Sequence, residues 1–128
     1  MAVRPSPVGP ILLSVLRIVA ALLFVEHGTI KLFGFPPGSP MPMPPAMTLF
    51  WFAGLIELVG GSLIALGLFT RAAAFLASGM CAVAYWTVHA PKSPYPVNNG
   101  GDAAILFCFL FLYLVFAGPG AWALRRKG

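Results

Sequence analysis

The residues best suited to chemistry in this sequence are ionisable side chains isolated within long apolar stretches. In chain order they are Arg17, Glu26, His27, Lys31, Glu57, His89 and Asp102. A charged group in apolar surroundings is costly, so such residues usually face one another inside a fold. Imidazole and carboxylate groups exchange protons in acid–base catalysis, and cations stabilise negative charge on oxygen. We therefore interpret His27 and Glu57 as candidates for proton exchange, and Arg17 and Lys31 as candidates for charge stabilisation.

A helical projection at about 100° per residue places these groups on defined faces. In the first apolar stretch, Arg17, His27 and Lys31 fall on one stripe, and Glu26 projects to the opposite side. Glu57 shares its face mostly with glycine and alanine, which predicts that another helix approaches closely there. Alternatively, Glu57 neutralises Arg17 or Lys31 in a structural ion pair.

The third and fourth stretches each add an ionisable residue and aromatic rings. His89 aligns with Tyr85, and Asp102 begins a stripe with aromatic side chains. We predict that most of these groups converge in one half of a helix bundle around a ligand head group. The predicted binding residues are Arg17, Lys31, His89, Asp102, Phe109 and Tyr113, with Phe116 completing the aromatic stripe. A network of ion pairs without a cavity is the alternative.

The stretches that carry these residues are long enough to cross a membrane. Hydrophobic residues make up 59% of the 128-residue chain and charged residues only 9%, whereas a soluble domain has about 25% charged residues. A span needs about 20 apolar residues. We predict an all-α integral membrane four-helix bundle, a single domain over 1–128 with spans at about 10–33, 47–69, 71–89 and 102–124. The first span is too long for a signal peptide, so we expect it to be retained.

The charge distribution predicts the orientation of this bundle. The net charge is +5, and the basic residues at the N-terminus, at the second loop and at the C-terminus would share one side of the membrane. They are Arg4, Arg71, Arg125, Arg126 and Lys127. The positive-inside rule then places both termini in the cytoplasm. These residues form no soluble basic face, so we expect no nucleic-acid partner. The proline-rich segment 36–45 is expected to be an extended outer loop.

Other kinds of site have weaker support. Cys81 and Cys108 do not form a Cys-x-x-Cys pair, and we interpret them as packing residues. The histidines and acids lack metal-ligand spacing on one helix, so we predict no metal site. The sequence shows no phosphate-binding loop, catalytic-triad arrangement or nucleotide fingerprint.

Several short motifs follow one another in a defined order. They are Leu16-Arg17, His27-Gly28, Lys31-Leu32-Phe33-Gly34, Ala53-Gly54 with Glu57 and Gly60-Gly61, Thr70-Arg71, Asn99-Gly100-Gly101-Asp102 and Gly118-Pro119-Gly120. With this order and spacing, the sequence resembles the DoxX family of small bacterial four-helix membrane proteins from about residue 13 to 124. It departs from the family pattern at Asp102, where glutamate is usual, and after Gly120, where the usual acidic tail is missing.

The resemblance implies a multi-pass protein of the bacterial inner membrane, linked to quinone or thiol-related redox chemistry. Our leading hypothesis is a membrane subunit of a quinone-associated redox system, with quinone as the suspected cofactor. Its partners would be the lipid bilayer and a peripheral or membrane oxidoreductase subunit, with a homo-oligomer as another possibility. The alternatives are a non-catalytic anchor or assembly subunit for a partner enzyme, and a pathway for a small solute or protons.

Overall fold

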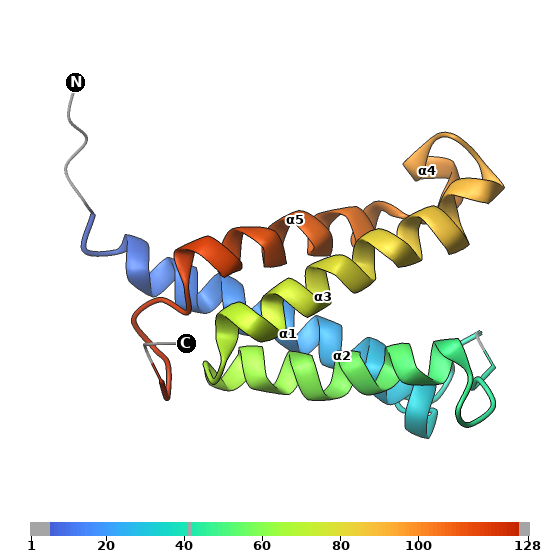
Figure 1. Ribbon diagram of the computed structural model, residues 1–128, viewed down its shortest axis with the longest axis horizontal. Helices are drawn as coiled ribbons and strands as arrows, with labels where there is room; N and C mark the ends of the chain where they lie inside the picture. Colours follow the sequence, from blue (N-terminus) through green and yellow to red (C-terminus); the bar gives the residue numbers. More distant parts are fainter. Residues whose placement is uncertain (1–5, 41, 126–128) are drawn as a thin grey trace.

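The computed structural model describes residues 6–40 and 42–125, and its regular structure there is entirely helical (Figure 1). The long helices are α1 (Gly9–Phe33), α2 (Leu49–Leu66), α3 (Thr70–Ala84) and α5 (Asp102–Ala117). A π-helical turn, η1 (Tyr85–His89), and a 3₁₀ turn, η2 (Ala90–Lys92), extend α3, and α4 (Pro96–Asn99) is one short turn. The predicted all-α class is confirmed.

Left-handed glycines end the first two helices. Gly34 closes α1 at φ 67° and Gly67 closes α2 at φ 74°, and the N–H of each donates back to carbonyls in the last turn. Glycine reaches this conformation without the Cβ penalty that other residues meet. The chain then enters α3 within three residues of Gly67. The short connection makes α2 and α3 neighbours in space (Figure 1).

The helices form two closely packed pairs, α1 with α2 and α3 with α5. A Cβ atom added at Gly28 would lie 2.7 Å from the backbone nitrogen of Leu58 and 2.8 Å from the carbonyl oxygen of Gly54. The backbones of α1 and α2 therefore touch at this point, as small residues allow in membrane helices. The prediction of a close helix approach on the Glu57 face is confirmed.

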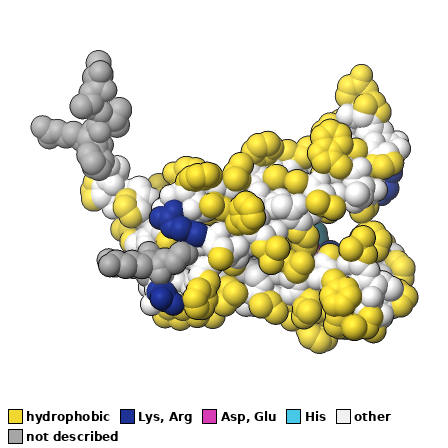
Figure 2. Space-filling model, viewed as in Figure 1, with side chains coloured by type: hydrophobic (Ala, Val, Ile, Leu, Met, Phe, Trp, Pro, Cys, Tyr) yellow, Lys and Arg dark blue, Asp and Glu magenta, His cyan; other side chains and the backbone are white. Residues whose placement is uncertain are grey.

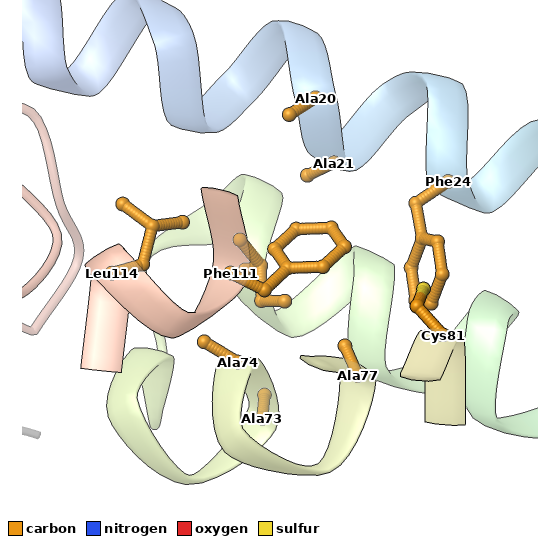
Figure 3. Packing of buried hydrophobic residues seen from close by; sticks show 10 residues of the cluster. Ala20, Ala21, Phe24, Ala73, Ala74, Ala77, Cys81, Phe111 and Leu114 are labelled. Atoms are coloured by element: carbon orange, nitrogen blue, oxygen red, sulfur yellow. The ribbon is translucent and has the colours of Figure 1, made fainter. Parts of the chain in front are cut away.

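Aromatic and alanine side chains join the two pairs. The Phe24 ring of α1 lies 4.9 Å from the Phe111 ring and 5.6 Å from the Phe107 ring of α5. Figure 3 shows Phe24 directed from α1 toward Cys81 of α3, with Ala74 and Ala77 of α3 near Phe111 of α5. Most other large apolar side chains point outward. Such an exterior suits a hydrocarbon solvent, because only polar groups must then be satisfied internally.

The lengths of the helices agree with a membrane protein. Gly9–Phe33, Leu49–Leu66 and Thr70–Lys92 are long and apolar enough to span a bilayer, and Asp102–Ala117 is a shorter apolar helix. Its 16 residues measure about 24 Å, somewhat less than a hydrocarbon core of about 30 Å.

The fourth helix ends earlier than the predicted boundary near residue 124. It stops at Ala117, and Gly118 follows with φ 78° and ψ −169°, outside any helical conformation. Pro119 then lacks the N–H that a continuing helix would need. Residues 118–125 instead fold back across the end of the bundle, where the N–H of Ala121 donates to the carbonyl of Pro10 at 3.1 Å.

Candidate functional site

A buried ion pair connects α1 and α2. Nζ of Lys31 donates to Oε1 of Glu57, and the two side chains are 22% and 4% exposed. Gly54 makes room for the pair, because the Lys31 side chain lies against the position that a Cβ would occupy there. Glu57 is thus interior and neutralised by the basic stripe of α1, as its small-residue face predicted.

His27 lies beside this pair on the side of α1 that faces α5. Its ring contacts the edge of Phe107 at a centroid distance of 6.1 Å, and it lies within electrostatic range of Glu57. The side chain is exposed, unlike that of Glu57. We call His27, Lys31 and Glu57 the α1–α2 polar cluster. It unites an imidazole, an ammonium group and a carboxylate.

The cluster belongs to the part of the molecule where the two helix pairs separate. Figure 2 shows a notch between the pairs at the end that carries α4. The buried aromatic contacts of Phe24 hold the pairs together closer to the other end. An exposed imidazole beside a buried ion pair can exchange protons with a molecule that enters from outside.

His89 is part of a separate polar network, formed by the segment between η1 and α5. Its Nδ1 lies 3.0 Å from the carbonyl oxygen of Asn99. The Asn99 amide donates to the Ser93 carbonyl at 3.0 Å and to the Tyr85 hydroxyl at 3.3 Å, and its oxygen accepts from the Gly101 N–H. Sequence reasoning assigned Asn99 only to a turn. Its burial, at 3% exposure, makes it the organising residue of this loop.

Asp102 begins α5 next to this loop, with an exposed side chain. Its carboxylate has no hydrogen-bond or ion-pair partner within residues 6–40 and 42–125. An acidic residue in the first turn is favourable for a helix because it faces the positive end of the helix dipole. Asp102 and His89 therefore form a rim, and within the described part of the chain neither makes a hydrogen bond or ion pair with Glu57.

Arg17 lies at the opposite end of the bundle from the polar cluster. Its guanidinium is 1% exposed and donates to the carbonyls of Pro119 and Trp122, and to that of Ala65 at 3.4 Å. Fourteen positions separate Arg17 from Lys31 on α1, a rise of about 21 Å. The prediction that Arg17 joins the head-group site, or pairs with Glu57, is wrong because backbone carbonyls already bind its guanidinium.

The aromatic stripe of α5 faces outward. Phe109, Tyr113 and Phe116 are 65%, 59% and 76% exposed, whereas Phe111 and Leu114 are fully buried. The prediction that the first three rings face the bundle interior is wrong. α5 is apolar on all sides after Asp102, so its sequence has no polar face that would fix its rotation. Phe107 supplies the aromatic contact beside His27 instead.

Two apolar grooves lie on the surface of the bundle. One, of about 310 Å³, lies between α1 and α5, and the other, of about 300 Å³, between α2 and α3. No ionisable residue lines either groove. In the described part of the chain, no three His, Cys, Asp or Glu side chains are grouped closely enough to hold a metal ion.

Comparison with known proteins places this arrangement in a family. Residues 12–90 match the DoxX family, which is more than half of the chain. The chain belongs to the DoxX family. The matched region contains α1 from residue 12 onward, α2, α3 and the whole α1–α2 polar cluster.

Two curated relatives cover nearly the full length of this DoxX-family chain. An uncharacterized protein of Haemophilus influenzae is 45% identical over 124 residues, covering 92% of this chain and 91% of the relative. The inner membrane protein YphA of Escherichia coli K12 is 32% identical over 133 residues, with the same coverage. No solved structure matches the chain. With its long apolar helices, the chain is a multi-pass inner membrane protein.

Proposed function

We propose that this protein is a membrane subunit of a quinone-associated redox system, and that the α1–α2 polar cluster binds the quinone head group. The observation that supports the proposal best is the position of exposed His27 beside the buried Lys31–Glu57 ion pair. Ionisable residues are rare in membrane helices and commonly mark functional sites. The family resemblance supplies the redox context.

The donor set of the cluster fits a quinone head group. The Lys31 ammonium can donate a hydrogen bond to a carbonyl oxygen, and the His27 imidazole can donate or accept a proton. The Phe107 ring beside His27 can contact the ring of the head group. A bound quinone would accept and release electrons, a chemistry that protein side chains do not supply. Glu57, held by Lys31, would accept a proton that His27 delivers.

The proposal includes a topology. Four helices cross the bilayer, and both termini are cytoplasmic. The contact between Ala121 and Pro10 supports it, because the start of α1 and the end of α5 lie at the same end of the bundle (Figure 1). Exposed Arg71 and Arg125 lie at that end too. Arg71 donates to the carbonyl of Val115 near the end of α5, and Arg125 packs over the ring of Phe69 in the α2–α3 connection. Basic residues are concentrated on the cytoplasmic side of membrane proteins.

Two alternatives belong to other functional classes. A non-catalytic anchor for a partner enzyme would use the ion pair only to fix α1 against α2. A pathway for protons or a small solute would use the same interior charges along a route.

Mass spectrometry of material retained after mild detergent extraction separates the three functions. We expect the parent protein to retain a stoichiometric amount of quinone and the His27→Ala variant to lose it. A stoichiometric soluble enzyme without quinone would favour the anchor. If neither quinone nor a soluble enzyme is retained, and the protein conducts a solute or protons across liposomes, the pathway would be favoured.

A further inference from the structure

The groove between α1 and α5 leads toward an unusual pair of polar residues. Its walls are apolar side chains: Leu16, Val19, Ala20 and Leu23 on α1, and Ala103, Leu106, Phe107 and Leu110 on α5. On a helix, residues three and four positions after Leu23 continue the same face. Those residues are Glu26 and His27. His27 also contacts Phe107, a wall of the groove. His27 therefore lies at the end of the apolar groove, and Glu26, seven residues after Val19, lies at its exposed edge.

Glu26 lies on the outward-facing surface of α1. Its side chain is exposed, and neighbouring Leu22 and Leu23 are 57% and 50% exposed. Within the described residues, its carboxylate has no hydrogen bond or ion pair. The α1–α2 polar cluster does not use it, because Glu57 is already paired with Lys31. An unpaired carboxylate in hydrocarbon is costly and calls for a polar molecule beside it.

The packing of α1 on α2 fixes the depth of this carboxylate. Gly28 touches Gly54 and Leu58, and Gly61 touches Ala21 and Val25. This register brings Glu26 level with the middle of α2, whose 18 residues span about 27 Å, close to the hydrocarbon thickness of about 30 Å. Glu26 also precedes Phe33, the last residue of α1, by seven positions, so it lies about 10 Å below that end of the helix.

We propose that this groove binds the apolar tail of an uncharged amphiphile, which enters sideways from the bilayer and places its hydrogen-bonding head against Glu26 and His27. The depth selects the ligand class. The charged head of a phospholipid stays at the membrane surface, whereas a neutral head with one hydroxyl or carbonyl group can lie about 10 Å deeper. The volume of about 310 Å³ is at the lower end of ligand pockets, roughly 300–1,000 Å³. A tailed quinone is one such molecule, so the inference extends the proposed function without requiring redox chemistry.

Photolabelling of the protein in lipid nanodiscs tests this site. The probe is hexadecanol with a diazirine in its tail, compared with a phosphatidylcholine that carries a diazirine in one acyl chain. We expect the alcohol to label the α1–α5 groove saturably, with competition by unlabelled hexadecanol. Ala103→Phe fills the groove from an exposed position and should reduce labelling at least fivefold. Val83→Phe adds the same ring to the α2–α3 groove and should leave labelling unchanged.

The head contact has its own variants. Glu26→Leu should weaken saturable labelling several-fold, and Glu26→Gln should retain it because the amide oxygen still accepts a hydrogen bond. Equal labelling of the groove by the alcohol and the phospholipid would mean ambient lipid only and would overturn the proposal. Full labelling of the groove in Ala103→Phe or Glu26→Leu would also overturn the proposal. A second polypeptide crosslinked at Glu26, without labelling by the alcohol, would overturn it as well. Failure here leaves quinone binding at His27 and Glu57 untouched, since hexadecanol has no redox head group.

Discussion

The Lys31–Glu57 ion pair joins α1 and α2 through two side chains of unequal exposure. Glu57 is nearly sealed at 4%, whereas Lys31 at 22% retains a path toward the membrane surface along its flexible stem. Removing one partner of a buried pair leaves the other charge uncompensated. The two single substitutions should therefore differ in cost.

We predict that Lys31→Met destabilises the protein more than Glu57→Leu. Lys31→Met leaves a sealed carboxylate, at a cost of about 3–5 kcal/mol, whereas the free ammonium of Glu57→Leu can reach the surface. Glu57→Gln keeps an acceptor for Lys31 and should cost less than Glu57→Leu. Thermal unfolding in detergent measures the order. The double variant Lys31→Met/Glu57→Leu is the control, and it should be more stable than Lys31→Met alone. Equal melting temperatures for all variants would contradict a buried pair.

Sequence reasoning at the residue scale predicted His27, Lys31 and Glu57 as neighbours, because charges inside apolar helices must pair. It failed for Arg17, since the sequence does not show that the chain after Gly118 returns to offer carbonyls. It failed for Phe109 and Tyr113, since an all-apolar helix has no polar face to set its rotation. The role of Asn99 was missed because its partners Ser93 and Tyr85 lie six and fourteen residues away along the chain.

At the scale of elements, the glycines of α1 and α2 set the distance between these helices. Gly28 has backbone atoms at 2.7 Å and 2.8 Å from the position of a Cβ, whereas Gly60 has nothing within 4 Å. The two glycines therefore form a matched pair of sites for the same substitution.

We predict that Gly28→Ala separates α1 from α2 and lowers the free energy of unfolding by about 1–3 kcal/mol, the usual cost of overpacking. Gly60→Ala should be neutral or slightly stabilising, because alanine is the better helix former. Unfolding of both variants in the same detergent provides the comparison. If Gly28→Ala is as stable as Gly60→Ala, the close contact is wrong.

The returning segment 118–125 is the second element that the structure defines. Ser14 supports it by accepting the Trp122 N–H at 2.8 Å, and Arg17 donates to two of its carbonyls. Arg71 donates instead to the last-turn carbonyls of Val115 and Phe116, each at 2.7 Å. Arg17 is buried and Arg71 is exposed.

We predict that Arg17→Met frees segment 118–125 and leaves the α1–α2 polar cluster intact. Hydrogen exchange of the segment's amides should accelerate at least tenfold, because the guanidinium is the donor that fixes its carbonyls. Arg71→Met, the control, should affect mainly the end of α5. Unchanged exchange in Arg17→Met combined with loss of quinone-analogue binding would instead assign Arg17 to the ligand site.

For the whole molecule, hydrophobic length and helix-breaking residues were sufficient to predict four apolar helices and their order. The Gly118-Pro119-Gly120 motif ends α5 at Ala117, so the helix stops before the predicted limit of the fourth span near residue 124. The division into two helix pairs was not predictable, because it depends on Gly28 contacts and on Phe24 packing between distant segments.

We predict that Ser6 and Pro40 lie on opposite sides of the inner membrane. In a Cys81→Ala/Cys108→Ala background, Ser6→Cys should react with a membrane-impermeant maleimide only after the cells are permeabilised. Pro40→Cys should react in intact spheroplasts, and so should Lys92→Cys, the control for the second outer loop. Equal reactivity of Ser6→Cys and Pro40→Cys in intact spheroplasts would contradict the topology.

Binding of a quinone head group by the α1–α2 polar cluster can be measured by titrating a short-chain quinone analogue into the purified protein. We predict that the parent binds the analogue saturably, and that His27→Ala and Glu57→Gln weaken this binding at least tenfold while the fold stays intact. Tyr113→Leu, which changes an outward-facing ring, should bind as the parent does. Quinone binding by the α1–α2 polar cluster would be contradicted if the parent did not bind the analogue, or if the cluster variants bound it as tightly as the parent.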